Sequence, residues 1–222
     1  MVQLVKQAYL LGADASNVGA DGSGDVLIED GVIRAIAPFL TEHPPDSYFI
    51  DGRGQFLGPG LVDLYSHSGE PGHESRETLV SLRRAAVAGG FTRVGVLPTT
   101  TPAVDSVGAI TTLQQTNQPS TNESVLMPWA AITLGANGEQ LSELAELTNA
   151  GAIGFADGRP LMNTVLLRRL LEYAQPLQKP IALWPCDIDL AKGGIAREGV
   201  DSIRLGLAGT SAIAETTALA PL

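Results

Sequence analysis

Residues 58–72 read Gly-Pro-Gly-Leu-Val-Asp-Leu-Tyr-Ser-His-Ser-Gly-Glu-Pro-Gly and decide how the rest of the chain is interpreted. The apolar run 61–65 predicts a buried β-strand, and polar groups follow it at once. Side chains two residues apart on a strand point the same way, so Asp63, Tyr65 and His67 are expected to share one face. The segment therefore predicts a strand that delivers polar side chains to a site at its far end.

After residue 60 the chain alternates between strand and helix signals. Strands are predicted over 61–65, 91–97, 125–133, 152–156 and 180–184, and helices over 77–88, 103–115, 140–150, 164–174 and 211–220. Nearly continuous apolar strands separated by helices indicate a parallel sheet covered on both faces. A closed eight-unit barrel typically needs ~250 residues, and only about 160 follow residue 60. About five βα units are therefore expected, not a closed barrel.

The first part of the chain predicts a different architecture. Asp30-Gly31 lies between alternating apolar residues, a strong hairpin signal, and Tyr48–Ile50 is a further strand candidate. Residues 1–57 are thus expected to form a small β-rich, sandwich-like domain. The predicted fold class is α/β: this small domain precedes an incomplete (β/α)8 TIM-barrel in residues 58–222.

Composition narrows the function classes. The net charge is −10, without a run of lysine or arginine, which argues against nucleic acid or an anionic membrane surface as partner. Cys186 is the single cysteine, which excludes an intrachain disulfide and a cysteine zinc cluster. Apolar runs are too short to span a bilayer, and the start lacks the features of a signal peptide. A cytoplasmic location is expected.

Sequence blocks in order from about residue 25 to the end resemble dihydroorotase of the long, bacterial type, a cyclic amidohydrolase. The blocks are 59–63, 70–72, 88–92, 102–106, 151–155, 157–160, 171–174, 198–199 and 204–207. The resemblance implies a metal-dependent (β/α)8 barrel with a small β-domain. It also implies a role in pyrimidine biosynthesis, the interconversion of dihydroorotate and N-carbamoyl-aspartate. The family performs this hydrolysis with a zinc-activated hydroxide and a catalytic aspartate.

The first barrel strand departs from the family pattern Asp-x-His-x-His. Tyr65 stands at the first histidine position, and His67 retains the second. A neutral phenol, with a reference pKa near ~10, is a poor replacement for an imidazole ligand. Two residues after the second histidine the family has an arginine that binds the substrate carboxylate. Gly69 occupies that position and offers no charge.

Later blocks depart as well. Thr99 stands where a substrate-binding asparagine is expected, and Trp184 replaces another metal-binding histidine. A large aromatic there is expected to fill the pocket. Asp157 matches a block with two aspartates and corresponds to either one, or is a turn residue before glycine. The metal-ligand candidates are therefore His67 and Asp157, with zinc binding weak or absent, and no catalytic residue is assigned.

Three hypotheses follow. In the first, the chain is a dihydroorotase-like pseudoenzyme that acts as a structural or interaction partner, with aspartate transcarbamoylase (through the resemblance) or a second copy as candidate partners. In the second, it is a zinc-dependent dihydroorotase or cyclic-amide hydrolase with a reduced one-metal site of His67 and Asp157, to which His73 or Cys186 is an optional addition. In the third, the chain is incomplete, and its remaining barrel lies elsewhere. Since the chain has three histidines where the family's two-metal site alone uses four, we expect it to be inactive as it stands.

Overall fold

The computed structural model describes residues 1–115 and 123–220 and divides the chain into two compact units, Met1–Gly60 and Leu61–Leu222. No helix in the described ranges is long and apolar enough to cross a membrane. Each unit has its own hydrophobic core.

The first unit is a five-stranded sheet. Its strands are β1 (Val2–Leu10), β2 (Ser23–Glu29), β3 (Val32–Ala37), β4 (Tyr48–Asp51) and β5 (Phe56–Leu57), with a short 3-10 helix η1 (Ala15–Asn17). The order is β3-β2-β1-β4, and β5 also pairs with β1. The predicted hairpin is confirmed, because β2 and β3 pair antiparallel around Asp30 and Gly31. Both turn residues have positive φ, 50° and 78°, as a two-residue hairpin turn of this kind requires.

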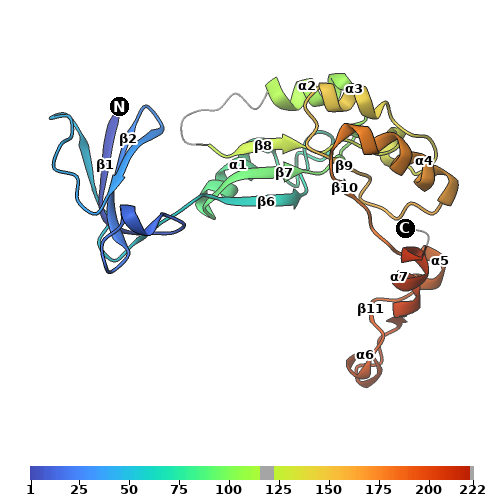
Figure 1. Ribbon diagram of the computed structural model, residues 1–222. Helices are drawn as coiled ribbons and strands as arrows, with labels where there is room; N and C mark the ends of the chain where they lie inside the picture. Colours follow the sequence, from blue (N-terminus) through green and yellow to red (C-terminus); the bar gives the residue numbers. More distant parts are fainter. Residues whose placement is uncertain (116–122, 221–222) are drawn as a thin grey trace. The chain divides into compact units, whose positions relative to one another are not determined.

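In the described part of residues 61–182, five parallel strands follow one another in chain order. These are β6 (Leu61–Ser66), β7 (Phe91–Val96), β8 (Val125–Pro128), β9 (Phe155–Ala156) and β10 (Ile181–Ala182). β6, β7 and β8 form one sheet, which Figure 1 shows with the strands side by side, and β9 pairs with β10. A parallel bridge from Ala130 to Phe155 joins the two groups. The five predicted strands are therefore present, four of them shorter than expected.

Helices connect these strands. They are α1 (Leu79–Ala88), α2 (Val107–Gln115), α3 (Leu144–Asn149) and α4 (Thr164–Ala174), with 3-10 turns η2 (Leu134–Ala136) and η3 (Gln175–Leu177). Side-chain caps begin two of them: Thr78 forms a capping box with Ser81 at α1, and Asn163 caps α4. α3 begins later than predicted because Leu141 forms an antiparallel bridge with Thr133 and is not helical.

The C-terminal part contains short elements that the sequence did not predict. They are α5 (Ile188–Ala191), β11 (Ala196–Arg197), α6 (Val200–Arg204) and β12 (Gly209–Thr210), and they precede the predicted helix α7 (Ala212–Leu219). β11 pairs parallel with β12. The Asp187 N–H donates to the carbonyl of Ala214, 2.8 Å away, which links the start of α5 to α7.

Successive side chains of β7 point to opposite faces of the sheet and belong to two different apolar clusters. Val94 and Val96 are buried in the core that includes Ile110 of α2 and Leu170 of α4. Leu97 belongs to a second cluster with Trp129 and Ala156, and Gly95 lies against the Trp129 indole. Residues two apart on a strand share a face, so one face of the sheet packs on helices and the other contacts Trp129. The second layer lies beneath the carboxyl ends of the strands.

Candidate functional site

The strand ends open onto two adjoining hollows. The larger, the His67 cleft, has a volume of about 660 Å³, and its walls include His67, Thr99, Asp157 and Arg159. The smaller, the Trp184 hollow, has about 390 Å³ and is lined by Tyr65, Leu97 and Trp184 among others. His67 and Gly158 line both. The carboxyl ends of parallel strands meet at one side of such a sheet, which explains why distant sequence positions converge.

His67 lies just beyond β6, and its side chain is exposed. Its Nδ1 is 3.3 Å from the Thr99 hydroxyl oxygen at the end of β7. The Thr99 methyl group in turn packs against Gly158, where an added Cβ would lie 2.5 Å from Thr99 Cγ2. Thr99 thus links the loops that follow β7 and β9, and it orients the imidazole from one side.

Asp157, directly after β9, is the buried acid of the cleft, with 2% of its surface exposed. Thr133 holds both carboxylate oxygens: its backbone N–H donates to Oδ1 at 3.0 Å and its hydroxyl to Oδ2 at 2.6 Å. The same hydroxyl accepts from the Gly138 N–H at 2.8 Å. Burial raises the pKa of Asp157, while the Thr133 hydrogen bonds and the positive charge of Arg159 act in the opposite direction.

The end of β6 is fixed from two directions. Asp63 lines neither hollow, because its carboxylate turns back on its own strand and accepts from the Tyr65 N–H at 2.9 Å and the Ser66 hydroxyl at 2.7 Å. These bonds, first the one from Tyr65, hold the pKa of Asp63 below its usual range. The Trp129 indole N–H donates to the carbonyl of Leu64 at 2.7 Å, and the Tyr65 ring stands edge-on to the indole at 6.1 Å.

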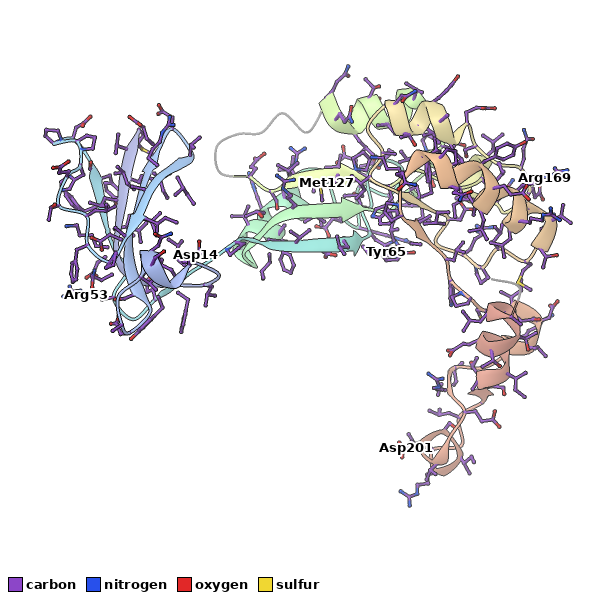
Figure 2. All side chains as sticks on the ribbon, in the orientation of Figure 1. Asp14, Arg53, Tyr65, Met127, Arg169 and Asp201 are labelled. Atoms are coloured by element: carbon purple, nitrogen blue, oxygen red, sulfur yellow. The ribbon has the colours of Figure 1, made fainter. Side chains whose placement is uncertain are left out.

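The positions that depart from the family pattern lie in distinct places. Figure 2 labels Tyr65 at the carboxyl end of β6, on the wall of the Trp184 hollow. Trp184 lines that hollow with 55% of its surface exposed. It therefore forms one wall of the hollow, whereas the sequence analysis expected it to fill the pocket. Gly69 lies beyond both hollows, and its backbone is packed against the following loop. An added Cβ there would stand 2.6 Å from the carbonyl oxygen of Glu77.

The donor set does not fit a two-metal zinc centre. His67 and Asp157 line the same cleft. His73 is exposed in the loop after β6, and Cys186 is buried beside a separate cavity of about 20 Å³. Across residues 1–115 and 123–220, no group of three or more histidine, cysteine or acidic side chains is arranged to hold a metal ion. Structural and catalytic zinc sites use at least three protein ligands.

Sequence reasoning did not single out three residues of this region. Thr133 and Trp129 both follow β8, one holding Asp157 and the other holding β6. Arg159 lies within the recognised block 157–160 but carried no assigned role. Two signals were available: a tryptophan at a strand end, and a cation two residues after a candidate acid.

The amino-acid sequence is similar to those of known proteins. The family model described as dihydro-orotase-like matches residues 54–220. A dihydroorotase of Anaeromyxobacter sp. (strain K) is 40% identical over 198 residues, which cover 89% of this chain and 45% of the relative. A probable dihydroorotase-like protein of Synechocystis sp. (strain ATCC 27184 / PCC 6803 / Kazusa) is 36% identical over 217 residues, with 89% and 49% covered. The chain thus spans about half the length of these relatives.

Solved structures agree on the fold. L-hydantoinase from Arthrobacter aurescens superimposes with a TM-score of 0.63 at 20% identity, covering 86% of this chain and 42% of that one. A dihydroorotase gives 0.53 at 16% identity, covering 81% and 50%. The predicted α/β class is confirmed, and both solved structures share the fold of this chain. Because the family model matches most of its length, the chain belongs to the dihydroorotase-like family.

Proposed function

We propose that this chain is a catalytically impaired member of its family, linked by resemblance to pyrimidine biosynthesis, that acts as a structural or interaction partner. The observation that carries the proposal is which residues share the Trp184 hollow with His67. Tyr65 and Trp184, at two positions where the family has metal-binding histidines, line the same hollow as His67. An indole N–H only donates hydrogen bonds, and a neutral phenol is a weak zinc ligand. A hydroxide-generating two-metal centre would lack most of its ligands.

Two partners are consistent with this proposal. Through the resemblance, aspartate transcarbamoylase is one, and a second copy of the chain is the other. Mixing the purified chain with purified aspartate transcarbamoylase and measuring the mass of the eluting species by light scattering separates them. A mixed complex or a homo-oligomer supports an interaction role, whereas a monomer under both conditions removes it.

The alternative is an active, zinc-dependent hydrolase with a reduced metal site. The shared position of His67 and Asp157 on one cleft favours this second reading. Such a site would require further ligands from outside the described residues or from water, because His73 and Cys186 line neither hollow.

A turnover assay with metal analysis decides between the two. We expect no interconversion of dihydroorotate and N-carbamoyl-aspartate above the buffer rate, with or without added zinc, and no zinc retained through gel filtration. His67→Ala is the informative variant, and His43→Ala, in the first unit, is its control. Turnover that His67→Ala abolishes and His43→Ala leaves intact would establish the active alternative.

A further inference from the structure

We propose that a separate hollow between α3 and the end of α4 binds a small organic amine. This hollow, the Tyr173 hollow, has a volume of about 420 Å³, and the two helices that flank it contact each other (Figure 1). It shares no lining residue with the His67 cleft or the Trp184 hollow. The inference therefore goes beyond the proposed function and does not depend on it.

The walls of the Tyr173 hollow are held by the core of the second unit. Leu144 is buried in that core, and Leu141 and Leu177 pack against it. The Ser142 N–H donates to the carbonyl of Ile132 at 2.9 Å, which ties this wall to the segment after β8. A preformed hollow of this size falls within the ~300–1,000 Å³ range of small-molecule sites.

Ser142 supplies the observation that points to a ligand. It lines the hollow with 6% of its surface exposed, and its Oγ has no hydrogen-bond partner among the described residues. A buried hydroxyl without a partner has lost its bonds to water and gained none in return, so such groups are uncommon in folded proteins. Rotation about the Cα–Cβ bond to another staggered position would turn this hydroxyl toward a ligand in the hollow.

The polar groups of the walls favour a ligand that donates hydrogen bonds and carries a positive charge. They are the hydroxyls of Ser142 and Tyr173 and the carboxylate of Glu143. No lysine, arginine or histidine lines the hollow, and in the described ranges none lies within ion-pairing distance of Glu143. A primary ammonium group has three N–H donors and no acceptor, which matches such a wall.

The remaining walls favour an apolar body on the amine. Three leucines and Ala145 offer apolar surface, and the ring of Tyr173, with 65% of the residue exposed, offers a face to a cation. A net charge of −10 raises the local concentration of cations around the chain. An aryl or alkyl amine therefore fits the hollow better than a neutral or acidic ligand of the same size.

Three phenyl compounds of similar size test the proposal. Phenethylamine, phenethyl alcohol and hydrocinnamate carry an ammonium, a hydroxyl and a carboxylate, and each is titrated into the purified full chain at neutral pH and low salt. Binding is followed through the NMR shifts of backbone amides, and the largest shifts should fall in residues 141–145 and 173–177. We expect the amine to bind at least about fivefold more tightly than the alcohol, the combined effect of an exposed ion pair and a cation–π contact. Hydrocinnamate should bind most weakly.

Substitutions identify the residues responsible. Glu143→Gln should reduce the preference for the amine over the alcohol to less than about twofold. The control, Glu139→Gln, removes the same charge from an exposed acid that does not line the hollow, and it should leave the preference unchanged.

Ser142→Ala separates a ligand-binding role from a structural one. Loss of the hydroxyl should weaken amine binding about threefold, because one hydrogen bond to the ligand is removed. The urea midpoint should stay the same or rise, since the hydroxyl has no partner among the described residues. A lower midpoint would show that the hydroxyl is bonded inside the protein and would remove it from the site.

Several results would overturn the proposal. These are an amine that binds no more tightly than the alcohol, shifts that fall outside the two segments, a preference that survives Glu143→Gln, and an equal loss in Glu139→Gln. Nα-acetyl-lysine amide represents a lysine side chain of another protein, and tighter binding of this compound than of phenethylamine would reassign the hollow to a protein partner. The proposed function fails independently, through turnover in the zinc assay, which none of these measurements involves.

Discussion

Asp157 shows how one buried side chain ties stability to pH. Its pKa is raised above the ordinary value by burial, so the folded state holds the proton more tightly than the unfolded state, whose pKa is ~3.9. The stabilising contribution of the protonated form is complete below ~3.9 and is lost as pH rises through the folded pKa. Stability relative to Asp157→Asn should therefore fall as pH increases through that window.

Carboxyl-carbon NMR titration checks the direction. Asp157 should titrate above ~3.9. Asp51 serves as a control of opposite sign, because its hydrogen bonds from Arg53 lower its pKa to about 2. An Asp157 midpoint at or below the ordinary value would contradict the burial argument.

At Gly69, nearby backbone atoms leave no room for a side chain. Gly69→Ala places a Cβ against the carbonyl oxygen and N–H of Glu77, at 2.6 and 2.8 Å. We expect a loss of about 1–3 kcal/mol in the free energy of unfolding, typical of overpacking. Gly108→Ala in α2, where an added Cβ meets nothing within 4 Å, should be neutral or stabilise by up to about 1 kcal/mol.

Urea denaturation of the two alanine variants measures this difference. Equal stability of the two would show that the loop 70–78 relaxes around Gly69 without cost. That outcome would also reopen room for an arginine at this position.

At the scale of elements, Trp129 connects β6 to the end of β8 across β7. Its indole passes Gly95, where an added Cβ would lie 2.9 Å from Nε1, and donates to Leu64. Trp129→Phe keeps an aromatic ring but removes the donor, so about 1–3 kcal/mol of stability should be lost. Amide exchange in β6 should also accelerate. The control is Trp184→Phe, at a side chain that is 55% exposed, with an expected effect within about 0.5 kcal/mol.

Exchange and denaturation curves for the two tryptophan variants separate local from global effects. If Trp129→Phe leaves β6 exchange unchanged, then the β6–β7 ladder alone holds the strand. In that case the positions of Tyr65 and His67 would not depend on Trp129.

The elements also show what periodicity does and does not predict. The hairpin at Asp30-Gly31 and helix α4 were predicted well, because turn chemistry and a leucine stripe are local signals. Strands β9 and β10 are only two residues long, although apolar runs predicted five in each case. Strand length depends on which neighbour supplies hydrogen bonds, and that is a tertiary property.

For the whole molecule, the free side of β6 is a site of expected self-association. In the described part of the chain, β6 pairs with β7 only, and its apolar residues Leu61, Val62 and Leu64 are about half exposed or more, at 54%, 48% and 65%. An unpaired, apolar strand edge pairs readily with another chain. Because each copy carries −10, association should strengthen as salt screens the repulsion.

Sedimentation velocity across a concentration series tests this expectation. Leu64→Lys should weaken self-association, whereas Val165→Lys, at an exposed apolar side chain of α4, should not. A chain that stays monomeric at all concentrations and salt levels, or equal effects of both lysines, would rule out the β6 edge as the contact.

The sequence by itself determined the lineage, the α/β class and the positions at which the family's site has changed. Such information is local: motifs, turn residues and apolar periodicity act within a few residues of the chain. Only the tertiary structure decided that Tyr65, His67, Thr99, Asp157 and Trp184 line adjoining hollows, because parallel strand ends converge from distant positions. It also revealed that Thr133 holds Asp157, that Trp129 holds β6, and that Arg159 lines the same cleft as Asp157. Contacts of this kind depend on burial and on hydrogen bonds across strands, which no local pattern encodes.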